Sequence, residues 1–200
     1  MILGDRLITD RDGNRYTLRL SVDVRSAILN DGNVETSVTA IRHVDDGDDI
    51  ELTALVRLES FERRIAIVLP EQLPIHIDIE YFEGFAERAG GEVDPLDDIE
   101  PGDLVERAAQ DLLDGAGLGE AIEAAIQRMP VPEPALGCPI KAGVSTTVGQ
   151  LIHCHNRHRR IEQRSSRAWE IVKCLGVNAP GMTIKATLRT LRCWLTLDVL

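Results

Sequence analysis

The chain has 200 residues, of which 44% are hydrophobic, so it is long enough and apolar enough to bury a core. It carries a net charge of −11, and no apolar run approaches the roughly 18 residues that a membrane span requires. The first residues, MILGDRLITDRDG, lack the charged leader and the apolar stretch of a secretory signal, so we expect a cytoplasmic protein with no membrane partner.

Residues 1–81 alternate apolar and polar side chains, as half-buried strands do. The run RYTLRLSVDV has the strongest alternation, with further runs at 50–58 and 75–81 and weaker ones at 34–44 and 65–69. Turn-forming sequences separate these runs: DRDGN, NDGN, DDGDD, SFERR and PEQLP. Five or six short strands at this spacing predict an antiparallel β meander that closes as a small sandwich or barrel.

After the strands the chain is expected to become helical. An acidic connector over 82–101 precedes a short helix from Asp103 to Gly115, and a second helix is expected over about 118–129. The sequence PVPEPALGCP at 130–139 predicts a semi-rigid linker. The predicted fold class is α+β, with an acidic β domain and connector at 1–101, a helical pair at 102–129, the linker, and a basic helical module at 140–200.

The distribution of charge supports a boundary at this linker. Residues 138–200 contain 10 Lys and Arg against 3 Asp and Glu, a net charge of +7, whereas residues 1–137 contain 12 against 30, a net charge of −18. Such polarity predicts a basic surface that binds an anionic partner.

The basic module is expected to form helices at about 146–163, 166–175 and 183–195. In the last of these, one apolar stripe is expected to pack in the core: Ile184, Leu188, Leu191 and Leu195. A second stripe is basic and is expected to face solvent: Lys185, Arg189 and Arg192.

The segment IVKCLGVNAPGMTIKATLRTL resembles a helix-turn-helix, with Ile171 ahead of the turn, residues 175–178 at the turn, and Thr183 and Ile184 opening the second helix. In that family the second helix lies in the major groove of DNA. The resemblance implies that DNA is contacted by Thr183, Lys185, Thr187, Arg189 and Arg192.

Five arginines gather near the junction of the first two expected helices: Arg157, Arg159, Arg160, Arg164 and Arg167. So many guanidinium groups cannot be buried without partners. They form ion pairs with the acidic part of the same chain or a neighbouring subunit, or they contact phosphates and give salt-sensitive binding to nucleic acid.

The sequence offers few candidate metal-binding or catalytic residues. The spacing of Cys154 and His158 fits two zinc ligands, but no second pair is found; the thiols of Cys138, Cys154, Cys174 and Cys193 are expected to be reduced. DRDGN resembles the start of a calcium loop but is expected to be a hairpin turn, and the acids at 94–103 are expected to be solvated. No catalytic motif is found, so we expect no enzyme, catalytic residue, bound metal or cofactor.

Two functions are consistent with this sequence. The first is a nucleic-acid-binding accessory or regulatory protein whose acidic β domain serves oligomerisation or partner binding. The alternative is a structural or assembly subunit of a virus particle or large complex, whose basic helices dock on acidic surfaces of neighbouring subunits. Both predict a homo-oligomer.

Overall fold

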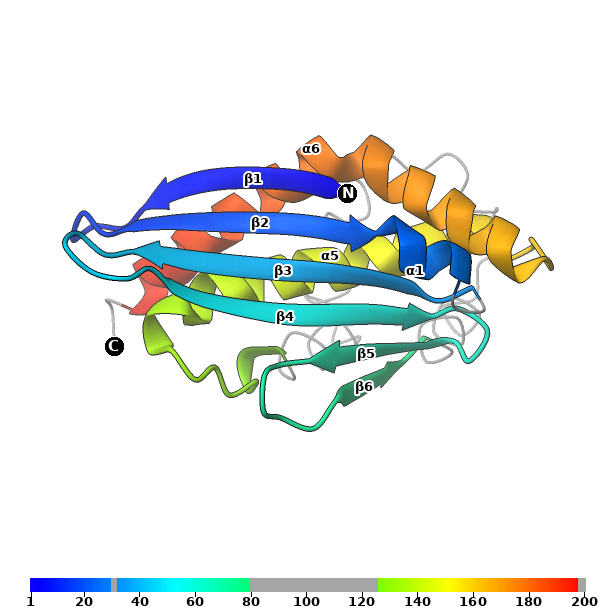
Figure 1. Ribbon diagram of the computed structural model, residues 1–200, viewed down its shortest axis with the longest axis horizontal. Helices are drawn as coiled ribbons and strands as arrows, with labels where there is room; N and C mark the ends of the chain where they lie inside the picture. Colours follow the sequence, from blue (N-terminus) through cyan, green and yellow to red (C-terminus); the bar gives the residue numbers. More distant parts are fainter. Residues whose placement is uncertain (30–31, 80–125, 198–200) are drawn as a thin grey trace, which may run out of the picture.

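The computed structural model describes residues 1–29, 32–79 and 126–197, which form one β-sheet with helices on one of its faces (Figure 1). The six strands are antiparallel and follow one another in chain order across the sheet. Their bounds are β1 Ile2–Thr9, β2 Arg15–Asp23, β3 Val34–His43, β4 Ile50–Glu59, β5 Arg64–Val68 and β6 Ile75–Asp78. The α+β class and the antiparallel meander are therefore confirmed.

The sheet does not close, so the expected sandwich or barrel is wrong. The inner face, which carries Leu18, Val38 and Val56, is buried beneath two helices rather than beneath a second sheet. The outer face is polar and carries cross-strand ion pairs, Arg19 with Asp5 and Arg57 with Glu35, at 2.9 and 2.7 Å. Only one face of the sheet is apolar enough to need a covering layer.

The turn between β1 and β2 is organised by Asp10. One carboxylate oxygen accepts hydrogen bonds from the backbone N–H groups of Asp12 and Asn14, and the other accepts from the Asn14 amide and the Tyr16 hydroxyl. Gly13 has a φ of 86°, a left-handed conformation that glycine adopts without strain. This network confirms the hairpin turn expected of DRDGN.

A short helix, α1, follows β2 at Val24–Leu29 and was not expected. The alternating run predicts a strand that continues through Val24. However, the side chain of Asp23 accepts hydrogen bonds from the N–H groups of Arg25 and Ser26 at 3.0 and 3.2 Å. An aspartate in this position caps a helix and ends the strand.

The basic segment is helical, as expected, but with different bounds. A 3₁₀ turn, η2 at Pro134–Leu136, leads into α5 at Gly137–His158, and α6 runs over Arg164–Leu197. Of the linker predicted at 130–139, residues 134–139 are thus η2 and the first turn of α5. The helix expected at 103–115, the acids at 94–103 and most of the helix expected at 118–129 lie outside the described residues.

Both helices lie behind the sheet in the view of Figure 1, with α5 against β3 and β4 and α6 mainly against β1. Two glycines allow this close approach. A Cβ on Gly143 of α5 would lie 2.4 Å from a methyl carbon of Val38, and a Cβ on Gly4 of β1 would overlap the side chain of Thr183. Buried side chains of the sheet and of both helices form a single apolar cluster.

Candidate interaction surfaces

Two disulfides fix the positions of α5 and α6. Cys138 is bonded to Cys193 and Cys154 to Cys174, so all four cysteines of the chain are paired, and the expectation of reduced thiols is wrong. Antiparallel packing brings cysteines 55 and 20 residues apart in sequence to Cα–Cα distances of 5.7 and 5.8 Å, a separation that a disulfide spans. The bonds hold the outer surface of this helical layer in one arrangement.

The helix-turn-helix implied by the sequence is not formed, because α6 continues from Arg164 to Leu197 through the segment assigned to the turn. Pro180 cannot donate a hydrogen bond to the carbonyl of Gly176, which costs about 3 kcal/mol in a helix interior. Buried residues on both sides of Pro180, Leu175 and Met182, pack on the sheet and outweigh that loss. Tertiary packing therefore keeps the helix continuous through a segment whose local sequence favours a turn.

The two threonines assigned to DNA contact have local roles instead. Thr183 is 5% exposed, faces Gly4 of β1, and donates its hydroxyl proton to the carbonyl of Ala179 at 2.9 Å. Thr187 is half-buried and donates to the carbonyl of Thr183 at 2.9 Å. Thr183 does not reach the surface, and Thr187 lies apart from the basic side chains.

The apolar stripe that we expected in the core lies on the surface. Its exposed fractions are 50% for Ile184, 60% for Leu188, 37% for Leu191 and 47% for Leu195. The helix packs through its opposite face: Ala168, Ile171, Val172, Leu175, Ala179, Met182, Ala186 and Thr190. Val177, 81% exposed, extends the surface stripe by two turns and was missed. Because the stripe lies about 180° from the packed face, it has no partner among the described residues.

Basic side chains of α5 and α6 meet on the solvent-facing side of the helical layer. Arg189 donates a hydrogen bond to the hydroxyl of Ser145 on α5 at 2.7 Å, and Lys185 stands one turn before it. Burial, and then the positive charges of Arg157, Lys185 and His158, lower the pKa of His153; burial and Arg189 lower the pKa of Lys185. These side chains form what we term the basic band: Arg157, His153, Lys185 and Arg189, with the exposed Arg192 one turn further on.

The arginines of the α5–α6 connection divide into two groups. The guanidinium groups of Arg164 and Arg167 lie 4.7 and 4.2 Å from the ring centre of Phe61 in the β4–β5 turn, so both make cation–π contacts. Burial and the nearby Arg63 lower the pKa of Arg167, which also donates to the carbonyl of Ile161 at 2.6 Å. Arg157, Arg159 and Arg160 are exposed. Phe61, an aromatic residue inside an expected turn, was the missed signal for this contact.

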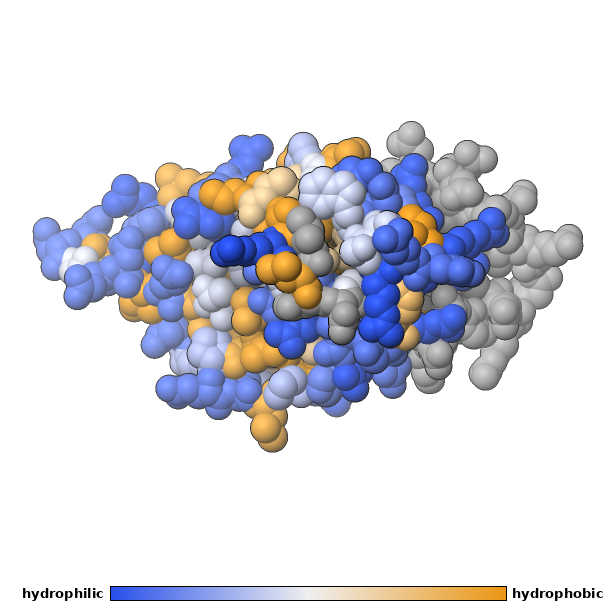
Figure 2. All heavy atoms as spheres, turned by 45° about the vertical axis from the view of Figure 1, so that its right-hand side comes forward, coloured by the Kyte–Doolittle hydropathy of each residue, from blue (hydrophilic) through white to orange (hydrophobic). Residues whose placement is uncertain are grey.

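Acidic residues gather at the other end of the sheet, where the β1–β2 and β3–β4 turns lie side by side (Figure 1). Arg15 beside the first turn pairs with Asp45 in the second at 3.0 Å, and Asp46 and Asp48 are exposed. The space-filling view shows this end as predominantly hydrophilic (Figure 2). Among the described residues, the molecule therefore has an acidic end, with Asp45, Asp46 and Asp48, and a basic end, with Arg157, Arg159 and Arg160.

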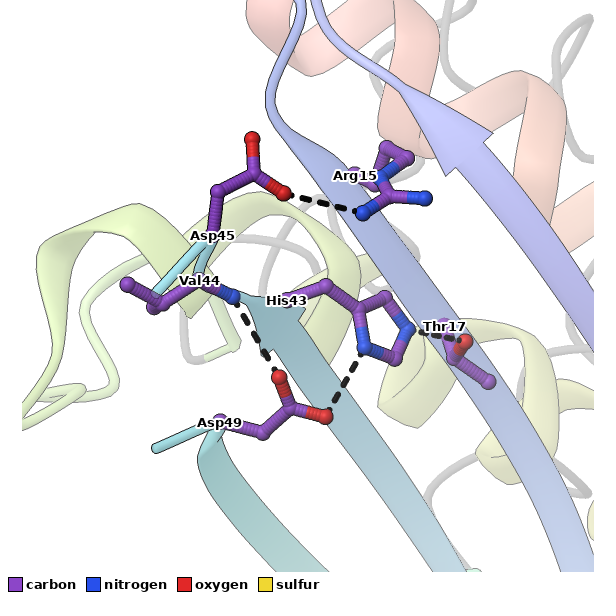
Figure 3. A network of polar contacts seen from close by, with 6 residues as sticks. All are labelled: Arg15, Thr17, His43, Val44, Asp45 and Asp49. Atoms are coloured by element: carbon purple, nitrogen blue, oxygen red, sulfur yellow. Dashed lines mark hydrogen bonds and ion pairs between the residues drawn. The ribbon is translucent and has the colours of Figure 1, made fainter. Parts of the chain in front are cut away.

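At the acidic end, Thr17, His43 and Asp49 are linked hydroxyl to imidazole to carboxylate, as the members of a catalytic triad are (Figure 3). His43 Nε2 lies 2.8 Å from the Thr17 hydroxyl, and Nδ1 lies 2.9 Å from Asp49; the hydrogen bond with His43 lowers the pKa of Asp49. Asp49 also accepts from the Val44 N–H, and the adjacent Arg15 is engaged by Asp45. On this solvent-facing surface, the network ties the β3–β4 turn to β2.

The residues considered as metal ligands are engaged in other bonds. Cys154 is oxidised, so it cannot join His158 as a thiolate ligand. Although partial burial raises the pKa of Asp10, its hydrogen bonds from Asn14, Tyr16 and Asp12 lower that pKa overall and occupy its oxygens. Across residues 1–29, 32–79 and 126–197, no three His, Cys, Asp or Glu side chains are grouped to hold a metal ion.

None of the helices in the described part of the chain has the length and apolar character needed to cross a membrane. Comparison of the chain with family models, with curated proteins and with solved structures gave no match. Four surfaces are therefore candidates on their geometry alone: the basic end, the acidic end, the basic band and the apolar stripe of α6.

Proposed function

We propose that this protein is an assembly subunit, not an enzyme, and that its copies associate by docking the basic end of one on the acidic end of the next. The observation that carries the proposal is the separation of unlike charges. Arg157 and Arg160 are exposed at the α5–α6 connection, and Asp45 and Asp48 are exposed at the opposite end. β3 and β4, with ten residues each, separate these ends by about 33 Å.

A contact between unlike ends leaves one end of each subunit free to bind another copy. Such heterologous contacts generate closed rings or open filaments. Ion pairs between exposed side chains are individually weak and are screened by salt, so the assembly is expected to be reversible and to weaken as ionic strength rises.

Size-exclusion chromatography with light scattering, at low and high salt, tests this proposal. We expect the wild-type mass at low salt to exceed that of a monomer and to fall as salt is added. Reversing either end alone, in Arg157→Glu/Arg160→Glu or in Asp45→Lys/Asp48→Lys, should abolish the larger species. An equimolar mixture of the two variants should restore it, because both the native ends and the reversed ends then attract.

The matched control reverses two exposed positive charges further along α6, in Arg189→Glu/Arg192→Glu, and should leave the mass unchanged. A wild-type chain that stays monomeric at low salt would contradict the proposal. Equal assembly by all variants would contradict it as well. If the arginines instead pair within the chain, reversing them will change the free energy of unfolding but not the mass.

Binding of nucleic acid is the second candidate, and the basic band favours it. Arg189 donates to Ser145 of α5, and the charges of Arg157 and Lys185 both act on His153. These side chains therefore lie along two helices that disulfides hold together, and they could follow a phosphate backbone. Without a helix-turn-helix, this binding would depend on phosphate contacts and would be largely independent of base sequence.

Titration of labelled duplex DNA at several salt concentrations separates the two candidates. If the basic band binds DNA, Lys185→Ala/Arg189→Ala/Arg192→Ala should weaken binding. The same variant should flatten the slope of log K against log salt by about 1 for each side chain that no longer neutralises a phosphate. If wild type shows no binding even at low salt, this candidate is eliminated and the assembly proposal is unaffected.

The disulfides bear on where the protein works. A cytoplasmic location was expected from the sequence, yet disulfides persist mainly in oxidising compartments or on particle surfaces. We therefore propose that the assembled form works in an oxidising environment. Alkylation of the protein under native conditions, followed by mass measurement, should find all four cysteines protected; four alkylated thiols would restore the cytoplasmic prediction.

A further inference from the structure

The outer face of α6 carries an apolar stripe with basic side chains along one of its flanks. Val177, Ile184, Leu188, Leu191 and Leu195 form a stripe that runs about 27 Å along the helix, at 1.5 Å per residue. Lys185 and Arg192 both lie on the side of this stripe that faces α5, whereas the side toward β1 carries the uncharged Thr187 and Trp194.

A pocket of about 160 Å³ opens beside this stripe, between α6 and α5. It is lined by Gln150, Val177, Asn178, Pro180, Gly181, Met182 and Lys185. Gly181 is one of the lining residues, and a Cβ there would meet no atom within 4 Å, so a larger side chain at this position would be accommodated and would cover part of the pocket. The lining thus combines the apolar Val177, Pro180 and Met182 with the ammonium group of Lys185, an arrangement that accepts an apolar anchor next to an acidic residue.

We propose that this face of α6 is the docking site for an acidic amphipathic helix of a partner protein, which buries its apolar side chains on the stripe and places its carboxylates against Lys185 and Arg192. Helices bind such surfaces through anchors at i, i+3 or i+4, and i+7 spacing. The one-sided basic flank fixes which side of the partner helix is acidic and therefore its orientation.

Charge complementarity favours this occupant over a second copy of α6. If two α6 helices met stripe to stripe in an antiparallel pair, the twofold axis would place both basic flanks on the same side, where like charges repel. An acidic helix meets no such repulsion. The site is separate from the two ends, so it does not depend on the proposed end-to-end assembly.

The test uses the full chain and two synthetic helical peptides of about 18 residues. The first carries leucines at i, i+3, i+7 spacing with glutamates along one flank; the second replaces each glutamate by lysine. Isothermal titration should show that the acidic peptide binds the wild-type chain at least about tenfold more tightly than the basic one. Leu188→Asp and Gly181→Leu should each weaken binding of the acidic peptide by about tenfold or more.

Matched controls are Leu73→Asp, at an exposed leucine of the β5–β6 turn, and Gly149→Leu, at a glycine of α5 whose Cβ would also meet no atom within 4 Å. Both should bind like wild type. Equal binding of the acidic peptide by wild type and the α6 variants would overturn the proposal, as would equal binding of both peptides. A wild-type dimer that Leu188→Asp dissociates would also overturn the proposal. The same holds if the wild-type chain binds anionic phosphatidylglycerol vesicles but not the peptide, and Leu188→Asp removes the vesicle binding.

Discussion

Strand β2 and helix α6 each carry a regular apolar pattern, but only in β2 does the pattern identify the buried face. Tyr16, Leu18, Leu20 and Val22 are at most 3% exposed. In α6 the corresponding stripe of aliphatic residues is 37–81% exposed, and the buried face includes small residues such as Ala168, Ala179 and Ala186.

The difference follows from the number of faces that each element offers. A strand has two faces, and when one carries charges the other must be buried. A helix offers a continuous surface, and α6 has two apolar sectors on opposite sides. The sector that packs combines large residues, such as Leu175 and Met182, with small ones that let the helix approach the sheet closely, as the contact of Thr183 with Gly4 shows.

Truncation of one leucine in each sector of α6 gives the largest expected contrast. Leu175→Ala removes a fully buried side chain and should lower the free energy of unfolding by about 2 to 5 kcal/mol. Leu188→Ala removes a side chain that is 60% exposed and should change it by no more than about 0.5 kcal/mol. Urea denaturation measures both. Similar losses would mean that the stripe is buried in solution.

The disulfides hold α6 in a way that has no counterpart in β2, which hydrogen bonds to two neighbouring strands. From the loop lengths, Cys138→Ala/Cys193→Ala should cost about 4 kcal/mol and Cys154→Ala/Cys174→Ala about 3 kcal/mol. Urea denaturation without reductant tests both values. If neither variant is destabilised relative to wild type, the cysteines are not bonded in the purified protein.

Two glycines of α5 test whether close approach sets the packing of the helical layer. Gly143→Ala introduces a methyl group against Val38, Leu18 and Leu20 and should destabilise by about 1 to 3 kcal/mol. Gly149→Ala points into open space and should stabilise by about 0.5 to 1 kcal/mol, because alanine favours a helix. Thermal unfolding should give opposite shifts in Tm, and shifts of the same sign would contradict the close approach.

The smallest expected effect is on pH dependence. Burial and neighbouring positive charges lower the pKa of His153 in the folded state from its ordinary value of 6.5. The unfolded chain therefore binds a proton first as pH falls below 6.5, and the free energy of unfolding decreases until pH passes the folded pKa. His153→Gln should make the decrease between pH 7.5 and 5 shallower. If the slope is unchanged, the decrease in the free energy of unfolding comes from other groups, such as His158, whose pKa is lowered mainly by burial.

Local sequence was sufficient for most of the sheet. The turns DRDGN, DDGDD, SFERR and PEQLP each mark a connection between two strands of the meander. In three of them the cause is local, because Asp bonds to nearby backbone, Gly permits a positive φ and Pro fixes φ. β1 was not among the expected runs, because it is an edge strand with Gly4 and a register shift near its start and its alternation is weak. The expected basic side chains at Arg157, Arg160, Lys185, Arg189 and Arg192 do reach solvent.

The sequence by itself determined the α+β class, the order of the strands and the concentration of positive charge in the last third, because these depend on residues close together in the chain. Only the tertiary structure decided the disulfide pairing, the continuity of α6 through Pro180, the burial of Thr183 and the face that α6 presents to solvent. Each of these depends on contacts between residues far apart in sequence, chiefly the antiparallel packing of α5 on α6 and the close approach of both helices to the sheet, and such contacts override local preference.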